Sequence, residues 1–383
     1  MPKKKIYFFT GKRGGFSHFV SIISELKKQK KISFKIIVAD MHLSSFFGKT
    51  IREITKFTNK IVRLNGLNIQ DSIENRIEKI SATTLGVSKI LRKDKPDFLF
   101  LLGDRGEVLG ASIAALHHNV PIFHMYGGDI TQGGTDEPTR HAITKISSIH
   151  LASNKKSLKN IINMGEEKWR TYNVGLSSLD LFRKEKFCAK DFLKKKYHLN
   201  FEQPFIILIQ HSVTWQVDEA KRQIKETIKA LNSLKIQTIA LYPCSDPGYL
   251  EIVKELKRNN NSFFKVYKNI EIKEFYSLLK LSSLIVGNSS CGILETNFFK
   301  KIAINIGIRQ EGRYLGKNII NVSHDSKKIE KAILKGLKLS KKNNIFDKKI
   351  YGDGDSAKKI VNIIYNHFKT KKNILINKKF IEK

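Results

Sequence analysis

Short apolar segments alternate with longer amphipathic segments along most of the chain. Residues 6–9, 98–102 and 205–209 are apolar runs, whereas residues 73–91 and 219–234 are longer and carry apolar side chains at helical spacing. Short apolar runs suit strands that are buried on both faces of a parallel sheet, and the amphipathic segments suit the helices that cover such a sheet. The alternation therefore predicts an α/β protein built from βα units.

The alternation is interrupted once, by a charged stretch without a strand pattern at about residues 181–203. A chain of 383 residues is long enough for two to three domains of roughly 150 residues each. We therefore expect two Rossmann-like domains, 1–180 and 181–370, that face each other across a cleft. Residues 371–383 are expected to form a solvated basic tail. A return of the last predicted helix, 356–368, to the first domain is left open.

The chain is strongly basic, with 70 Lys and Arg against 35 Asp and Glu and a formal net charge of +35. Such a charge is compatible with a binder of nucleic acid or membrane surfaces and with an enzyme for anionic small molecules. Nucleic-acid binding usually shows a concentrated basic stripe, whereas the lysines here are scattered over helix-like segments. The pattern favours the enzyme, and no nucleic-acid partner is expected.

The cysteines and the apolar runs bear on the compartment. Cys188, Cys244 and Cys291 lie far apart and form no paired motif, which suits a reducing cytoplasm. No apolar run approaches the roughly 18 residues that a membrane span requires, and the N-terminus lacks the apolar segment of a signal peptide. We expect a cytoplasmic protein without a membrane span.

Open parallel sheets bind ligands beyond the carboxyl ends of their strands, so the residues that follow each predicted strand are informative. The glycine-rich residues 10–15 follow the first strand, where they can cradle an anion or simply form a tight turn. An acid and a base, Asp104 and Arg105, follow the strand at 98–102. Asp104 can serve a site there or cap the next helix.

The densest polar cluster follows the next strand, at residues 124–141. It holds four glycines, three acids, two histidines and one arginine within 18 residues. If a helix begins near Pro138, Glu137 and His141 share one face, as do Asp136 and Arg140. A polar, glycine-rich loop at a sheet edge usually carries function, although a helix with an acidic first turn is the simpler interpretation. No metal-binding spacing such as HExxH occurs, so no metal is expected.

Small hydroxyl residues follow a strand of the second half, in the sequence GNSSCG at 287–292, with Glu295 one helical turn later. Hydroxyl and backbone N–H groups at a helix start can cradle a phosphate, and Glu295 can accept hydrogen bonds from ribose hydroxyls. An ordinary serine cap is the alternative. His211 follows the strand at 205–209, and Arg309 and Arg313 follow the strand at 302–306.

Six segments together resemble one family. They are TGKRGGF at 10–16, GDRGE at 103–107, HMYGGDITQGGTDEPTRHAITK at 124–145, QHSVT at 210–214, GNSSCGILE at 287–295 and NIGIRQEGR at 305–313. In this order they resemble the UDP-hydrolysing UDP-N-acetylglucosamine 2-epimerases of bacterial sialic-acid and legionaminic-acid synthesis. The resemblance implies two Rossmann-like domains in a glycosyltransferase-B-like fold, frequent homodimers, and no metal or NAD cofactor.

The resemblance also implies the reaction. UDP leaves C1 of the sugar in an anti elimination while a base removes the C2 proton, which gives a 2-acetamidoglucal. Water then adds across the new double bond, and C2 is reprotonated on the other face, so that N-acetylmannosamine and UDP are released. By motif position, Asp104 and Asp129 are the leading acid–base candidates. Glu137, with Asp136 beside it, is the next candidate and can orient the sugar or serve the other face.

The basic residues are expected to serve the phosphates. Arg13, Arg105 and Arg140 are candidates to contact phosphate or to hold the acids in place. The other expected UDP contacts are His211, Ser289 and Ser290 at the diphosphate, Glu295 at the ribose, and Arg309 and Arg313 on the nucleotide side.

Departures from the family pattern leave the hexosamine open. Lys12, Gly14 and Gly15 differ from the usual first loop, Tyr126 stands where His or Glu is frequent, and Asp129 stands where Glu is common. The alternative substrate is UDP-N,N'-diacetylbacillosamine, from the legionaminic-acid route. A UDP-sugar glycosyltransferase of the same fold is a further alternative, although it would not need Asp104, Asp129 and Glu137 together.

Overall fold

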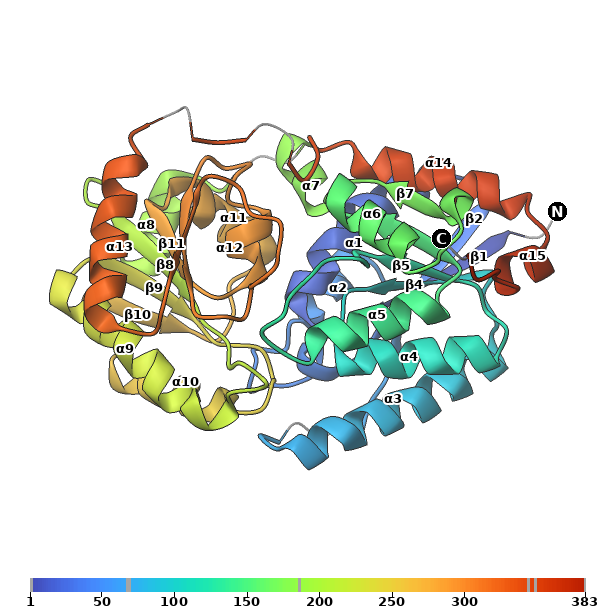
Figure 1. Cartoon of the computed structure of the whole chain (residues 1–383), viewed down its shortest axis with the longest axis horizontal. Helices are drawn as coiled ribbons and strands as arrows, with labels where there is room; N and C mark the ends of the chain where they lie inside the picture. Colours follow the sequence, from blue (N-terminus) through green and yellow to red (C-terminus); the bar gives the residue numbers. More distant parts are fainter. Residues whose placement is uncertain (1–2, 67–69, 185–186, 343–344, 348–349, 382–383) are drawn as a thin grey trace.

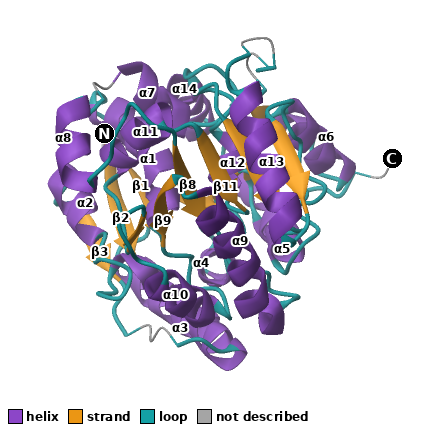
Figure 2. Cartoon of the chain, turned by 90° about the vertical axis from the view of Figure 1, so that its left-hand side faces the viewer, coloured by secondary structure: helices purple, strands orange, loops and turns teal. Residues whose placement is uncertain are grey.

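A computed structural model describes residues 3–66, 70–184, 187–342, 345–347 and 350–381. Two lobes lie side by side, and each lobe is built on a parallel β-sheet (Figure 1). In a view turned by 90°, in which the lobes overlap, the strands lie in the interior and helices surround them (Figure 2). This is the two-domain α/β architecture that the alternation of apolar and amphipathic segments predicts.

The first sheet has seven parallel strands in the order β3-β2-β1-β4-β5-β6-β7. Its strands are β1 (Lys4–Thr10), β2 (Ile32–Val38), β3 (Ile61–Arg63), β4 (Phe98–Leu102), β5 (Ile122–Met125), β6 (Ile149–Ala152) and β7 (Thr171–Asn173). The helices between them are α1 (Arg13–Lys27), α2 (Ile51–Phe57), α3 (Ile73–Lys93), α4 (Gly106–His117), α5 (Asp136–Ile146) and α6 (Lys155–Asn163), and α7 (Ser178–Lys184) follows β7.

The second sheet has six parallel strands in the order β10-β9-β8-β11-β12-β13. Its strands are β8 (Phe205–Ile209), β9 (Gln237–Leu241), β10 (Phe264–Tyr267), β11 (Leu284–Gly287), β12 (Ile302–Ile306) and β13 (Ile319–Val322). The helices of this lobe are α8 (Lys190–Tyr197), α9 (Ala220–Leu234), α10 (Tyr249–Arg258), α11 (Ile272–Leu281), α12 (Ser290–Leu294) and α13 (Ser326–Leu339). The strand β8 is apolar and buried at every position, as a central parallel strand requires.

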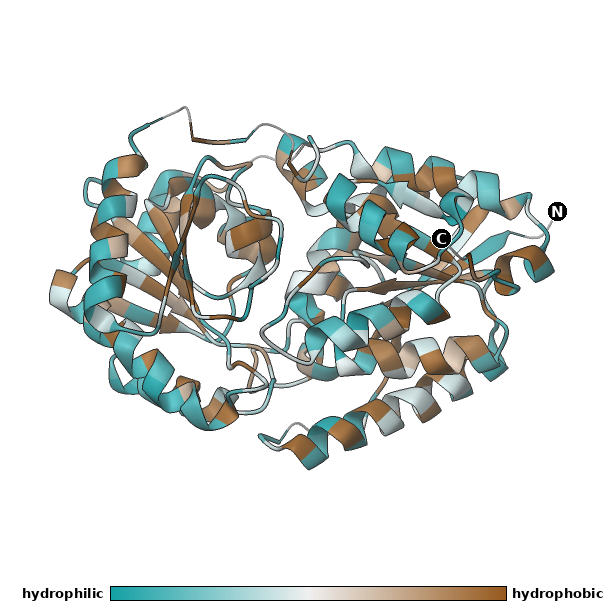
Figure 3. Ribbon diagram, viewed as in Figure 1, coloured by the Kyte–Doolittle hydropathy of each residue, from teal (hydrophilic) through white to brown (hydrophobic). Residues whose placement is uncertain are grey.

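Each sheet is covered on both faces by apolar packing. In the first lobe, Phe8 and Phe100 point to one face and pack with α1, whereas Leu99 and Leu101 point to the other face and pack with α3 and α4. The separation into two layers follows from the alternation of side chains along each strand. In Figure 3 the strands inside the lobes are mainly brown, whereas the helices around them are a mixture of brown and teal. Within the described ranges, none of the helices combines the length and apolar character needed to cross a bilayer.

The chain returns to the first lobe after α13. Helix α14 (Ser356–Phe368) packs against α1, and its residues Ile360 and Ile364 belong to the same core as Ile6 and Phe8 of β1. In Figure 1 this helix lies along the outer side of the first lobe. The core of the first lobe is therefore completed by a segment from the far end of the sequence.

The structure departs in part from the solvated tail predicted after residue 370, although most of the described residues there are exposed. Helix α15 (Lys372–Ile376) forms there, and its Leu375 is buried in the core of the first lobe. The buried guanidinium of Arg170 donates to the carbonyl oxygens of Leu375 and Asn377, both at 2.9 Å. The five lysines after residue 370 make the segment polar in sequence, whereas a buried leucine and contacts with a distant arginine help to anchor it.

Candidate active site between the two sheets

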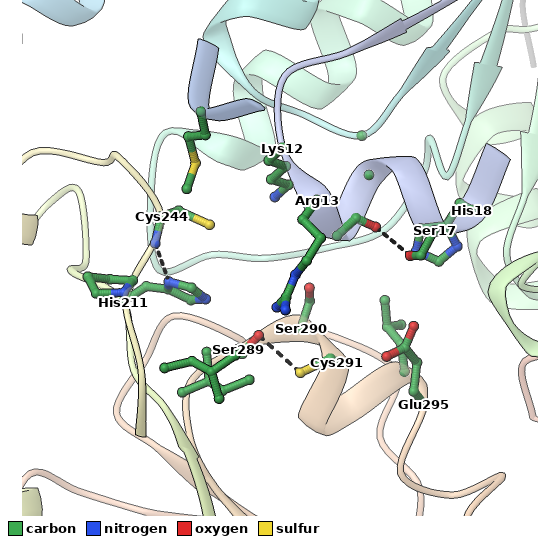
Figure 4. A pocket seen from close by; sticks show the side chains of 18 of the residues that line it. Lys12, Arg13, Ser17, His18, His211, Cys244, Ser289, Ser290, Cys291 and Glu295 are labelled. Atoms are coloured by element: carbon green, nitrogen blue, oxygen red, sulfur yellow. Dashed lines mark hydrogen bonds between the residues drawn. The ribbon is translucent and has the colours of Figure 1, made fainter. Parts of the chain in front are cut away.

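A cavity with a volume of about 200 Å³ lies between the two lobes, at the carboxyl ends of both sheets. Residues from both lobes line it, and Figure 4 shows Lys12 and Arg13 of the first lobe opposite Ser289 and Ser290 of the second. Of the predicted site residues, the cavity wall contains Arg13, Asp104, Asp129, Arg140, His211, Ser289, Ser290, Glu295, Arg309 and Arg313. Most residues named from separate strand ends therefore lie around one space.

Asp104 lies just beyond β4. Gly103, which separates it from the strand, takes a φ of +81° and turns the chain there. Its carboxylate accepts a hydrogen bond from the buried guanidinium of Arg140. Burial acts to raise the pKa of Asp104, but the positive charges of Arg140, Lys12 and Arg313 outweigh it and hold this pKa below its usual range. Asp104 is therefore a carboxylate at neutral pH.

Asp129 lies in the loop after β5 and is held from both lobes. One of its oxygens accepts from Ser153 Oγ at 3.2 Å and from Ser157 Oγ. The other oxygen accepts from Arg313 of the second lobe at 2.9 Å, an ion pair across the cavity. The same arginine has a buried Nε without a hydrogen-bond partner among the described residues. Asp129 thus joins the first lobe to the second across the cavity.

Asp136 and Glu137 stand in the first turn of α5 and do not line the main cavity. Glu137 accepts from the backbone N–H of Thr131 at 2.8 Å and lies 3.4 Å from His141. Asp136 lies 3.4 Å from Arg309. The structure therefore brings Asp104 and Asp129 to the cavity but leaves these two acids beside it.

The second lobe supplies hydrogen-bond donors. Ser289 and Ser290 stand at the start of α12 and face the cavity (Figure 4). The Nδ1 atom of His211 accepts from the backbone N–H of Cys244 at 2.9 Å, so the neutral ring carries its proton on Nε2. Burial and the charge of Arg309 keep the pKa of His211 well below its usual value. His211 is therefore a neutral donor.

Glu295 lies buried in the cavity wall, one turn after the serines. It accepts from Tyr276 Oη at 2.8 Å and from Ser178 Oγ at 3.0 Å. Burial raises its pKa to about 7, although these two hydroxyls act in the opposite direction. Arg13 donates to the carbonyl of Ile270 and places its guanidinium 5.2 Å from the ring centre of Phe275.

The structure corrects the UDP-binding role expected of Arg105. This residue does not line the cavity, and its buried guanidinium binds Glu107 at 2.6 Å and Asp246 at 3.1 Å. It also donates to Ser245 Oγ at 3.0 Å. The planar guanidinium satisfies several acceptors at once, so its donors serve protein groups. The expectation that it holds acids in place is the part that fits.

Three cavity residues escaped the sequence analysis as site residues. Lys12 extends into the cavity and forms no ion pair within the described part of the chain. Its position in the loop after β1 could have identified it as a site residue from the sequence. Tyr126 hydrogen-bonds His18 Nδ1 at 3.1 Å. Tyr276 reaches Glu295 from the regular helix α11, where periodicity marks only a core position.

Two Rossmann-like domains with carboxylates on one wall of the cleft and neutral or cationic donors on the other define a glycosyltransferase-B-like enzyme that acts on a nucleotide sugar. The sequence model of the family described as UDP-N-acetylglucosamine 2-epimerase matches residues 24–365. The chain belongs to this family.

Individual relatives agree with this assignment. The chain is 31% identical over 368 residues to the UDP-N,N'-diacetylbacillosamine 2-epimerase (hydrolyzing) of Legionella pneumophila, covering 94% of this chain and 95% of the relative. It is 29% identical over 339 residues to a UDP-N-acetylglucosamine 2-epimerase of Neisseria meningitidis serogroup B, covering 88% and 89%. The crystal structure of UDP-GlcNAc 2-epimerase from Neisseria meningitidis bound to UDP-GlcNAc shares the fold, with a TM-score of 0.80, 16% identity, and 94% and 100% of the two chains covered.

Proposed function

We propose that this protein is a hydrolysing 2-epimerase that converts UDP-N-acetylglucosamine to N-acetylmannosamine and UDP. One observation carries the proposal: Asp104 and Asp129 line the same cavity as Ser289, Ser290 and His211 of the opposite lobe. Proton-transfer groups and an anion-binding wall therefore share one space. A transferase would need the anion-binding wall but not the two carboxylates.

The carboxylates suit the chemistry at C2. The C2 proton is weakly acidic, so a positioned base must remove it. Inversion at C2 then requires a proton donor on the opposite face of the sugar. Asp104 and Asp129 come from loops after neighbouring strands, β4 and β5, and we propose that they serve the two faces. Arg140 binds both segments, through the carboxylate of Asp104 and, at 2.9 Å, the backbone carbonyl of Asp129.

The donors of the second lobe suit the leaving group. Departure of UDP develops negative charge on its β-phosphate, and preorganised donors stabilise such charge in the transition state. The Nε2–H of His211 and the hydroxyls of Ser289 and Ser290 are donors of this kind. Arg13 and Lys12 add positive charge from the first lobe. Water then adds at C1 of the glycal to complete the reaction.

The second candidate substrate is UDP-N,N'-diacetylbacillosamine. The relative from Legionella pneumophila carries this substrate in its name and matches nearly the full chain. The two sugars differ at C4 and C6, away from the C1 and C2 atoms that react. The same groups would therefore serve both substrates.

The test is product analysis with each UDP-sugar in deuterated water, without an acceptor. We expect UDP and a free 2-acetamido sugar of inverted C2 configuration, with deuterium at C2. The Asp129→Asn variant is the matched control, expected to lose turnover while it retains UDP affinity. UDP release only when an acceptor sugar is added would indicate a glycosyltransferase, and a product without deuterium would reject the elimination route.

A homodimer and a cytoplasmic location stay predictions. The three cysteines are free thiols in the described structure, which suits a reducing compartment. Sedimentation of the purified protein would measure the oligomeric state.

A further inference from the structure

The segment Lys372–Ile381, here called the C-terminal strap, lies against the C-terminal end of helix α5. The ammonium group of Lys378 lies 2.7 Å from the carbonyl oxygen of Lys145 and 2.8 Å from that of Ser147. It also lies 3.3 Å from the carbonyl oxygen of Thr144. The side chain of Lys378 is only 15% exposed. A cation from the strap therefore occupies the position at which α5 ends.

Several contacts fix the strap in this place. Lys378 forms an ion pair with the buried carboxylate of Glu166 at 2.7 Å, and Glu166 also binds His150 at 2.8 Å. The backbone N–H of Ile381 donates to Gly165 at 3.2 Å. Together with the hydrogen bonds from Arg170 to α15, these contacts hold both sides of Lys378. Its position is determined by the fold rather than by a mobile chain end.

A cation at this position has a defined effect on α5. The last carbonyl groups of a helix have no partner within the helix, and the helix dipole makes that end negative. An ammonium group at the carbonyl oxygens of Lys145 and of the C-cap residue Ser147 satisfies acceptors there and stabilises this end of the helix. Helix α5 has only 11 residues, so a restraint on its last turn also restrains its first turn.

Two routes lead from the last turn of α5 to Asp104. Along the helix, Arg140 binds the carboxylate of Asp104. Across the sheet, Thr144 Oγ1 lies 3.2 Å from His124 Nδ1, and His124 Nε2 donates to the carbonyl of Gly103 at 2.8 Å. The residue before Asp104 and the partner of its carboxylate are thus both tied to the turn that Lys378 caps.

We propose that Lys378 is a positioning residue, which caps α5 and thereby fixes the Arg140–Asp104 pair for proton transfer. This proposal rests on the proposed function, because it concerns the step in which Asp104 acts. Lys378 touches α5 from outside the cavity and is absent from the cavity wall. It therefore acts through the helix and not on the substrate.

The experiment compares three full-length variants: Lys378→Met, Lys378→Arg and Lys379→Met. The neighbouring Lys379 is exposed, so Lys379→Met is the control for the loss of one positive charge. For Lys378→Met we expect kcat to fall about tenfold, since small displacements of catalytic groups are costly. UDP affinity should stay within twofold, because most proposed donors for UDP lie in the other lobe, and Lys12 and Arg13 of the first lobe do not belong to α5. Lys378→Arg should restore most of kcat, and Lys379→Met should match the wild type.

The pH profile separates positioning from a general loss of structure. Asp104 faces Arg140 and Asp136 from α5, His124 from β5, Lys12 from the loop after β1, and Arg313 from the second lobe. If α5 shifts, Arg140 lowers the pKa of Asp104 less strongly. The acidic limb of the kcat profile of Lys378→Met should then move to higher pH. The position of this limb does not depend on how much folded enzyme is present.

Three results would overturn the proposal. They are a wild-type kcat and pH profile in Lys378→Met, a loss of kcat that Lys378→Arg does not restore, and a loss accompanied by equal loss of UDP affinity. If Lys378→Met does not fold, Lys378→Gln, which retains one donor, is measured in its place with the same criteria. Absence of UDP release by the wild-type protein would instead refute the proposed function.

Discussion

Glu295 is an acid of the cavity wall that is buried among neutral hydrogen-bond donors. Its side chain is buried, and two hydroxyl groups, from Tyr276 and Ser178, are its hydrogen-bond donors. Burial disfavours the charged form, and two neutral donors compensate for this only in part. The pKa of about 7 therefore places the ionisation of Glu295 within the physiological range.

This environment predicts how stability depends on pH. The pKa of Glu295 is about 7 in the folded protein and 4.5 as the ordinary value, so between these values the folded state holds a proton that the unfolded state has lost. Its contribution to stability is present below pH 4.5 and is lost as the pH rises through 7. Glu295→Gln removes this loss. Between pH 4.5 and pH 8, the unfolding free energy of the wild type should therefore fall by roughly 3 kcal/mol more than that of Glu295→Gln.

Urea unfolding of both proteins at pH 4.5 and pH 8 measures this difference. The two proteins should differ in the change of unfolding free energy between the two pH values. An identical change in both would show that Glu295 ionises in the folded state as it does in water.

Residues that follow a strand could be predicted as site residues, whereas residues with distant partners could not. Asp104, Asp129 and His211 each follow a buried strand, and parallel strands bring their carboxyl ends together. Arg105 carries the same local signal as Asp104, but its partner Asp246 lies 141 positions away. Only the packing of the two lobes decides that Arg105 points to that acid and not to the ligand.

At the scale of elements, side chains from α3, from the start of α4 and from the segments that follow β2 and β9 meet in a buried ionic cluster between the lobes. Arg105, at the start of α4, binds Asp246 of the loop after β9. Lys79 of α3 binds Asp40 at 3.3 Å, and Arg105 also lies 3.4 Å from Asp40. The neighbouring Cys244 of the same loop donates its backbone N–H to His211. The cluster therefore fixes the loop that orients His211, a predicted contact of UDP.

Loss of Arg105 should destabilise the protein strongly. Arg105→Met leaves the carboxylates of Asp40, Glu107 and Asp246 buried with fewer partners, and removal of one member of a buried ion pair costs about 3–5 kcal/mol. Urea unfolding measures the cost. Arg222→Met is the matched control, because the Arg222–Glu219 pair is exposed, at 59% and 46%, and such pairs contribute roughly 0–1 kcal/mol. Equal effects of both substitutions would contradict a structural role for the cluster.

The central strands could be predicted from the sequence, but the edge strands could not. Strands such as β4 and β8 are apolar at every position, because both faces of the sheet are covered. The three-residue strands β3 (Ile61–Arg63) and β7 (Thr171–Asn173) lie at the two edges of the first sheet. Such short segments carry no period of their own, and the ladder beside them determines their conformation.

At the scale of the whole molecule, the cavity belongs to neither lobe alone. The donors proposed for UDP come mainly from the second lobe, whereas Arg13, Lys12 and the acids come from the first. A ligand that fills it must contact both sheets. Ligand binding should therefore stabilise the molecule as one unit.

Hydrogen exchange with and without UDP tests this expectation. At UDP concentrations 100 times the dissociation constant, we expect a gain of about 2.7 kcal/mol in unfolding free energy. Added protection of backbone amides should occur both at residues 12–15 and at residues 289–292. Protection confined to the second group would show that UDP binds one lobe without engaging the other.

The return of α14 to the first lobe separates the order of synthesis from the order of folding. Residues 4–173 contain every strand of the first sheet, yet the face covered by α14 stays open until residues 356–368 have been translated. The second sheet is complete by residue 322. On the ribosome, the later lobe can thus close before the earlier one. The exposed face of the earlier lobe includes Phe98 and Phe123, whose rings contact Phe368 and His367 of α14, and it is the surface on which a chaperone would act during that interval.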